Sequence, residues 1–469
     1  MFANIANTFA NCFKIPELKS RIIFTLLVLA ICRVIAIIPI PGLDGAALTA
    51  YAARNAARAG GGGGGLLGMY SLFTGGALER CAIGALGIMP YISATIIIQL
   101  LSAVIPTLSK LAREEGGRTK IIQYGRYLTV LLCLGQGLAM ALGWEHPDKI
   151  FSGFDGRLVL VENLWWYRMQ TVLLVTTGTL LLMWLGEQIS ERGIGNGISL
   201  VITIGILARF PTTGRAVYYM FFPGGGQPVS KGILFQSIAL ILLLLAVIAA
   251  VIAVTQAQRK IPVQYAQRSV GRKVVPGGTS FMPLRVNYAG VMPIIFAQAI
   301  LMFPEGMFRM LGSTFNLKLF NEIALLLTHG SFTYICLEGL MIIFFSYFWV
   351  ATQFNELQIS DDLKKYGGYI PGVRPGHATS QFLHEAMSRI TLAGAVFLAG
   401  IAILPVVLYR ALNVPFEVAS FFGGTSILIT VGVMLDTLRQ MESHLLMRHY
   451  DGFLRGGRGG SGPRLRGRF

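Results

Sequence analysis

The chain has 469 residues, of which 54% are hydrophobic and 13% are charged, and its mean hydropathy is +0.63. A soluble domain carries about a quarter charged residues, so this composition excludes an ordinary soluble protein and indicates a surface that faces lipid. The formal net charge of +17 is compatible with nucleic-acid binding, but Lys and Arg also collect in the cytoplasmic loops of membrane proteins. The composition therefore predicts an all-α protein that spans a membrane several times.

Apolar runs and the residues that interrupt them predict about ten membrane-spanning helices. In chain order they cover residues 21–39, 77–105, 121–143, 168–186, 196–210, 233–254, 288–304, 333–352, 390–409 and 416–438. The second is long enough to be tilted or broken, and the fifth is short and interrupted by glycine. Residues 1–20 carry Lys14 and Lys19 among polar residues and are expected to form an exposed lead-in, not a secretory signal peptide.

Lys and Arg are concentrated in the loops on the side of the N-terminus, which predicts that both termini are cytoplasmic. Ten spans divide into an N-terminal half over 1–210 and a C-terminal half over 211–454. The two halves are expected to be pseudo-symmetric and to enclose a central pore, since inverted repeats are common in transport proteins. The tail over 455–469 is rich in Gly and Arg and is expected to be disordered.

Three loops have unusual sequences. A glycine run over 60–65 precedes a short apolar piece at about 66–76, which is either an ordinary external loop or a re-entrant segment that lines a protein cavity. The inner loop over 255–287 has six basic residues and no acidic residue; it is either a docking surface for an anionic partner or an ordinary cytoplasmic loop. The inner loop over 353–389 holds Arg374 between two Pro-Gly pairs, where the arginine binds a carboxylate or carbonyl of a partner or closes the loop on itself.

No catalytic motif is present: the sequence lacks a phosphate-binding loop, a His-Glu-x-x-His helix and a nucleophile-elbow serine. Five scattered cysteines indicate neither a disulfide framework nor a metal cluster. We therefore expect no enzyme activity, cofactor or metal. Charges inside the spans are few, and only Arg33 lies clearly deep. A secondary transporter for a small solute remains the alternative to a channel, although it usually has paired charges at mid-membrane.

Several strings, in order along nearly the whole chain, together resemble the SecY family, the channel subunit of the bacterial protein-export translocon. They are Pro39-Ile40-Pro41-Gly42, Phe73-Thr74-Gly75-Gly76-Ala77-Leu78, Leu86-Gly87-Ile88-Met89-Pro90-Tyr91-Ile92-Ser93-Ala94, Ile97-Ile98-Gln99-Leu100-Leu101, the run from Trp184 to Ser199, Tyr265-Ala266-Gln267-Arg268, Pro371-Gly372-Val373-Arg374-Pro375-Gly376 and Phe422-Gly423-Gly424-Thr425-Ser426. The resemblance implies a protein-conducting channel of the general secretory pathway, which translocates unfolded preproteins and releases membrane helices sideways into lipid.

The resemblance also implies roles for individual residues. The pore ring would be Ile88, Ile92, Ile202, Ile295 and Ile429. The plug that closes the outer funnel would include Leu67, Met69, Tyr70, Leu72 and Phe73, with a hinge of six glycines that is longer than the family leads us to expect. The lateral gate between the second and seventh spans would contain Gln99 and Gln298. Docking residues would be Arg259, Lys260, Arg268, Arg272, Lys273 and Arg374.

The implied partners are small membrane subunits resembling SecE and SecG, the SecA motor ATPase, the ribosome, signal sequences of preproteins, and membrane lipids. The implied location is the inner membrane of a bacterium. The basic tail lies outside the resemblance.

Overall fold

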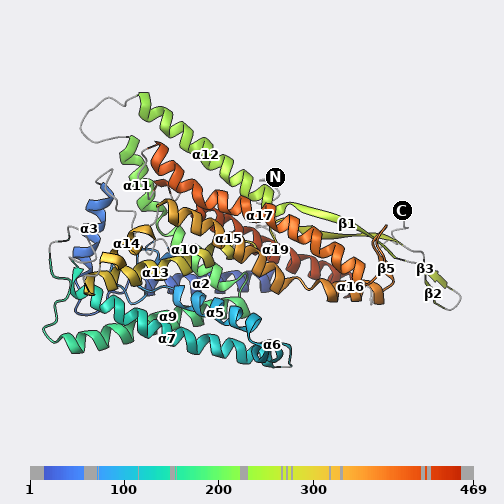
Figure 1. Ribbon diagram of the computed structural model, residues 1–469, viewed down its shortest axis with the longest axis horizontal. Coiled ribbons are helices and arrows are strands. Elements are labelled where there is room, and N and C mark those ends of the chain that lie inside the picture. The colour runs from blue at the N-terminus through green and yellow to red at the C-terminus, as the bar shows by residue number, and fades with distance from the viewer. Residues whose placement is uncertain are drawn as a thin grey trace.

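A bundle of long helices lies roughly along one axis, with a small β-sheet projecting from one end (Figure 1). The computed structural model describes residues 15–57, 71, 73–114, 116–147, 154, 156–221, 231–265, 268–270, 273–275, 278–315, 318–327, 331–412, 418–419 and 424–455. We call the end that carries the sheet the β end.

The predicted N-terminal half contains seven of the described helices, α2 (Pro16–Ile35), α3 (Gly45–Ala57), α5 (Met89–Val104), α6 (Pro106–Arg113), α7 (Gly117–Glu145), α9 (Leu164–Arg192) and α10 (Gly197–Leu207). Capping residues in the local sequence mark where α9 and α10 begin. Asn163 caps α9 by accepting from the backbone N–H groups of Trp165 and Trp166, and Asn196 caps α10 in the same way, as expected for asparagine at this position.

The predicted C-terminal half contains α11 (Phe210–Phe221), α12 (Lys231–Gln256), α13 (Met292–Phe315), α14 (Lys318–Leu326), α15 (Phe332–Gln353), α16 (Glu356–Lys365), α17 (His377–Leu412) and α19 (Thr425–Arg455). Its strands are β1 (Gln258–Tyr265), β2 (Arg268–Val270), β3 (Lys273–Val275), β4 (Thr279–Arg285) and β5 (Gly368–Tyr369).

Each of the ten predicted spans overlaps a helix of the structure. Among the described residues, six stretches are long and apolar enough to cross a membrane: Thr119–Glu145, Leu164–Arg192, Gly197–Arg215, Ile238–Gln256, Phe332–Lys365 and His377–Leu408. Two shorter apolar helices, Met89–Val104 and Met292–Leu301, correspond to the second and seventh predicted spans. The first and tenth predicted spans lie on α2 and α19. A polytopic helical membrane protein is therefore confirmed, and the count of ten is consistent with the structure.

The second span is shorter than predicted. Residues 75–87 form turns, and the helix begins only at Met89 with Pro90 in its first turn, a position that proline favours. An isolated bridge joins Pro39 to Ala82, so the turns fold back against the end of α2. Gly75 and Gly87 have φ values of +63° and +59°, a left-handed conformation that ends any regular helix here.

The basic loop over 255–287 forms strands, which the all-α prediction omitted. β1 pairs antiparallel with β4 from Gln258↔Arg285 to Gln264↔Thr279. Along β1 the buried side chains alternate, with Ile261 4% and Val263 2% exposed, as the two-residue period of a strand requires. β5 pairs with the other edge of β1, so the sheet joins the loop over 255–287 to the loop over 353–389.

The largest apolar core joins the two halves of the chain. It contains buried side chains from α2, α5, α9 and α10 together with side chains from α12, α13, α15, α17 and α19. A second core lies against α3, α7 and α9, and a third lies beneath the sheet. The five-plus-five boundary at residue 210 stays a prediction.

Candidate functional site

Five isoleucines of the largest core are all almost completely buried. Ile88 is 2% exposed, Ile92 4%, Ile202 2%, Ile295 1% and Ile429 1%, and all five belong to one apolar cluster. They come from the turn before α5 and from α5, α10, α13 and α19. We call these five residues the isoleucine collar. The resemblance predicted a ring of these residues, and the structure brings elements of both halves together at them.

An all-aliphatic collar has a simple physical consequence. Closely packed branched side chains leave no polar group to hold water or ions, so a narrow passage lined by them closes by dewetting. The same surface offers no hydrogen bond that would retain a polypeptide. The collar can therefore act as a seal that a passing chain displaces without being bound.

The predicted plug lies largely outside the described residues: Leu67, Met69, Tyr70 and Leu72 are not described. Phe73 is described, is 8% exposed and belongs to the same apolar cluster as the isoleucine collar. We call residues 73–80 the turn segment. It is the described stretch that connects the predicted plug region to α5.

Two arginines hold the turn segment, and sequence reasoning did not predict either contact. Arg33 on α2 donates to the carbonyl of Gly75 at 3.2 Å. Arg209, just after α10, forms an ion pair with Glu79 at 2.6 Å. Nothing local in the sequence indicates that Glu79 and Arg209, 130 positions apart, form a pair.

The predicted gate residues lie on helices that are neighbours. α5 and α13 pack against each other, which matches the predicted contact between the second and seventh spans. Gln99 on α5 is half-buried. Gln298 on α13 is 4% exposed and donates from Nε2 to Oε1 of Glu338 on α15 at 3.2 Å. The Gln298 amide is thus bonded to α15, within the same half of the chain.

Glu338 is a buried acidic residue in the second turn of α15. Its side chain is 1% exposed and is among the buried side chains of α15. Oε2 of Glu338 and Oε1 of Gln298 have no hydrogen-bond partner among the described residues. This is a single carboxyl group paired with an amide, not the pair of opposite charges expected at the centre of an ion-coupled transporter.

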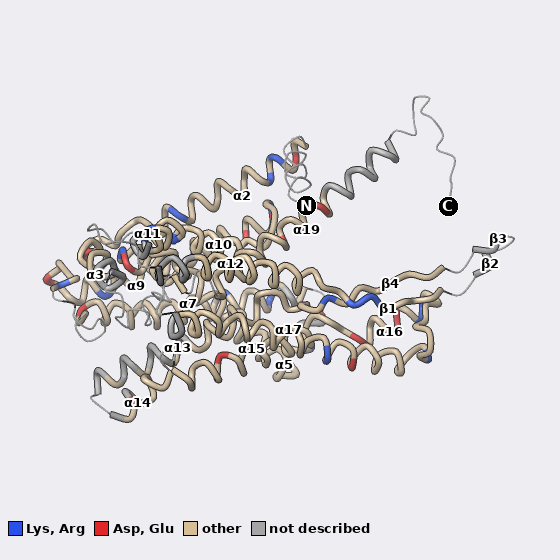
Figure 2. The backbone as a smooth tube through the Cα atoms, turned by 90° about the horizontal axis from the view of Figure 1, so that it is seen from above, with Lys and Arg blue, Asp and Glu red and all other residues tan. Residues whose placement is uncertain are grey.

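The predicted docking residues gather at the β end. Arg259 and Lys260 are exposed on β1, and Figure 2 shows basic residues along the paired strands β1 and β4. Arg268 lies on β2 and Lys273 on β3, which form a separate hairpin further out, while Arg272 is outside the described residues. Pairing of β1 with β5 brings the second loop to the same end of the molecule.

Arg374 is exposed in the turn between β5 and α17. The turn is fixed by side chains of flanking helices, because Ser360 donates to the carbonyl of Gly376 at 2.6 Å and Thr379 donates to the carbonyl of Arg374 at 2.9 Å. No ion pair of the Arg374 guanidinium occurs among the described residues. The structure thus favours a guanidinium available to a partner over one that closes the loop.

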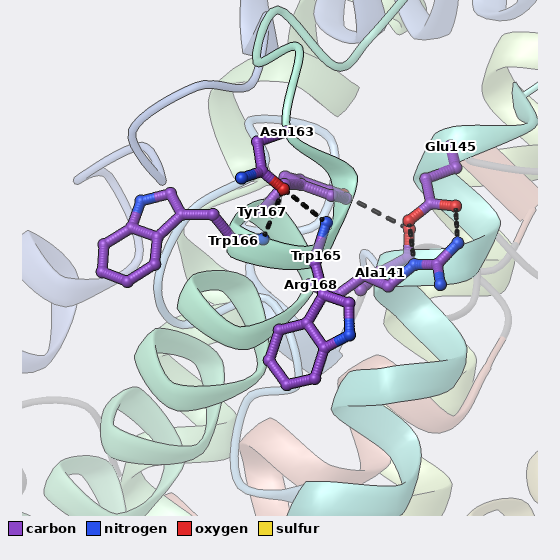
Figure 3. Close-up of polar contacts among 7 residues, drawn as sticks. All are labelled: Ala141, Glu145, Asn163, Trp165, Trp166, Tyr167 and Arg168. Carbon is purple, nitrogen blue, oxygen red and sulfur yellow. Dashed lines mark hydrogen bonds and ion pairs between the residues drawn. The ribbon is translucent and has the colours of Figure 1, made fainter.

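Two ion pairs connect the antiparallel helices α7 and α9. Arg126 binds Glu187 through two hydrogen bonds of 3.2 and 2.8 Å, and Arg168 binds Glu145 through two of 2.6 and 2.7 Å (Figure 3). Each ion pair marks one level along the two helices. Between the two levels, residues 127–144 of α7 and 169–186 of α9 carry no charge. At about 1.5 Å per residue the two levels are about 28 Å apart, close to the hydrocarbon thickness of about 30 Å.

Tryptophans mark the same two levels. Trp165 and Trp166 are 68% and 65% exposed in the first turn of α9, just before Arg168 (Figure 3), and Trp184 is 53% exposed three residues before Glu187. Tryptophan is enriched where the hydrocarbon meets the headgroups. The α7–α9 pair therefore defines where the bilayer lies along the helix bundle.

Comparisons with known proteins agree with this architecture. The SecY family model matches residues 82–438. Protein translocase subunit SecY of Chlamydia trachomatis is 42% identical over 454 residues, covering 96% of this chain and 98% of that protein. Protein translocase subunit SecY of Thermotoga maritima is 41% identical over 453 residues, with the same coverage. A solved structure described as a protein conducting channel has a TM-score of 0.59 at 18% identity and covers 94% of both chains.

The helical bundle has the fold of a solved membrane channel of the protein-conducting class, with an apolar core between its halves. Within that class, the identity to curated relatives and the family match show that the chain belongs to the SecY family.

Proposed function

We propose that this chain forms the channel through which unfolded preproteins cross the membrane, with the isoleucine collar as its constriction. The observation that carries the proposal is the position of the collar, five buried aliphatic side chains contributed by both halves of the bundle. The chain conducts polypeptide and is not an enzyme. The transporter alternative is set aside, since the relatives are translocase subunits and the shared fold is that of a channel.

Disulfide formation with a stalled precursor tests the proposal. Single cysteines replace Ile92 and Ile429 in a chain without native cysteines, and a precursor with one cysteine is stalled midway by a folded domain. We expect signal-dependent disulfides at both positions. Leu131→Cys, on an exposed face of α7, is the matched control and should form none. Crosslinks confined to the β end would show docking without conduction and would overturn the proposal.

The lateral gate is proposed to lie between α5 and α13, with Gln99 and Gln298 on its two helices. Contact between these helices supports the assignment. An apolar signal sequence that separates α5 from α13 would pass between two apolar stretches, Met89–Val104 and Met292–Leu301, on its way from the pore to lipid. A disulfide between cysteines placed across the two helices should block export of a precursor and be relieved by reduction.

The β end is proposed to be the cytoplasmic docking surface, with both termini on that side of a bacterial inner membrane. Exposed Arg259, Lys260 and Arg374 support this, because basic residues collect on the cytoplasmic side and attract anionic partners. A related Sec61 structure is a ribosome–channel complex, so the ribosome is the proposed partner, with the SecA motor as a second. Small subunits resembling SecE and SecG are proposed to contact the bundle within the membrane.

A further inference from the structure

An arginine at the end of α10 holds the stretch of chain that leads from the predicted plug into α5. Nη2 of Arg209 lies 2.6 Å from Oε1 of Glu79, and Nη1 donates to Oγ of Ser71 at 2.5 Å. The side chains of Arg209 and Glu79 are 11% and 18% exposed, and Ser71 is fully buried. One guanidinium thus joins two points of the chain, eight positions apart, to the same end of α10.

A second arginine, on α2, binds the same stretch. Arg33 on α2 donates to the carbonyl of Gly75. A Cβ atom on Gly75 would clash with Nη1 of Arg33 and would lie 3.0 Å from Cα of Gly205 on α10. A side chain at Gly75 would therefore displace the Arg33 guanidinium and crowd the backbone of α10.

This attachment is linked to the isoleucine collar through Phe73. Phe73 lies between the two points that Arg209 holds, and its side chain belongs to the same apolar cluster as the collar. A Cβ on Gly205 would lie 3.0 Å from the carbonyl oxygen of Phe73, so this part of the chain rests directly on α10. Releasing Ser71 and Glu79 from Arg209 would free Phe73 to leave the collar cluster.

We propose that Arg209 is a latch that keeps the channel shut by binding Ser71 and Glu79, and that the latch is released when a polypeptide enters. The inference rests on the proposed function as a channel. Glu79 and Arg209 are positioning residues, since each acts through the placement of the turn segment. A charged hydrogen-bonded pair suits this task, because it is directional when formed and each charge can be hydrated once water enters the open pore.

A charge-swap experiment on the assembled complex in proteoliposomes tests the latch. The variants are Arg209→Glu, Glu79→Arg and the double variant, and the measurement is halide efflux without any precursor. We expect each single variant to raise efflux about tenfold, because like charges then face each other. A tenfold rise corresponds to a loss of about 1.4 kcal/mol from the free energy that favours the closed channel over the open one. The double variant should return efflux to the parent rate, since it restores an opposite-charge pair.

The α7–α9 ion pair supplies a matched control. Arg126→Glu, Glu187→Arg and their double variant make the same changes of charge at a pair that joins α7 to α9 and not the turn segment to α10, and efflux should stay at the parent rate. Should the reversed charges prevent assembly, Arg209→Gln and Glu79→Gln remove the ion pair with little change in shape, and a smaller rise in efflux is expected because no like charges face each other.

A second measurement separates failure of the latch from failure of the channel. Precursors with a weakened signal sequence should be exported more readily by the single variants. Unchanged efflux and unchanged signal dependence in assembled variants would overturn the latch, while the Ile92 and Ile429 crosslinks would still stand. Absence of those crosslinks in the parent would overturn the channel itself.

Discussion

Replacing Gln298 by leucine should destabilise the protein because it leaves a buried carboxyl group without its hydrogen-bond donor. Glu338 is 1% exposed, and its bond to Gln298 spans 3.2 Å between α13 and α15. A buried polar group left unsatisfied costs about 1–3 kcal/mol, whereas hydrogen bonds between membrane helices contribute about 0.6 kcal/mol on average. We therefore expect Gln298→Leu to cost about 1.5 kcal/mol.

The double variant Gln298→Leu/Glu338→Leu distinguishes the loss of a donor from the loss of packing. Replacing both polar partners by apolar groups of similar size is nearly neutral, so the double variant should be more stable than Gln298→Leu alone. Reversible unfolding of the complex in mixed micelles gives the free energies for this double-mutant cycle. Equal stabilities of the parent and Gln298→Leu would refute the reasoning, as would a double variant that shows the sum of both single losses.

Three further predictions concern other contacts. Gly75→Ala should lower the melting temperature more than Gly76→Ala, because both glycines have positive φ but only a Cβ at Gly75 meets neighbouring atoms; equal losses would show that backbone strain alone matters. Arg168→Gln should lower the melting temperature, while Glu145→Gln should lower it less, because removing the arginine leaves a carboxylate whose side chain is 4% exposed; the reverse order would contradict this. Arg374→Ala should reduce ribosome binding in a sedimentation assay without lowering the melting temperature, since its side chain is exposed; unchanged binding would place the docking site elsewhere.

Local properties of the sequence determined the class of protein and the positions of most helices. Hydropathy runs located α7, α9, α12 and α15 to within several residues, whereas α17 begins well before its predicted span. The need for about 20 apolar residues in a membrane span is a local constraint. Family strings then pointed to the isoleucine collar, residue by residue. Secondary structure in the basic loop was missed, since β1 is stabilised by pairing with β4 and β5, which lie far from each other in the sequence.

Contacts between distant segments were decided only by the tertiary structure. Each of the charges Arg126, Glu145, Arg168 and Glu187 is ordinary in the sequence, and their pairing depends on the antiparallel register of α7 and α9. Glu79 lies near the start of the second predicted span, and Arg209 lies near the end of the fifth. They form a pair only because the turn segment folds back onto α10. Hydropathy and spacing describe a single helix, whereas an ion pair requires two surfaces to meet in one register, and that is a property of the whole bundle.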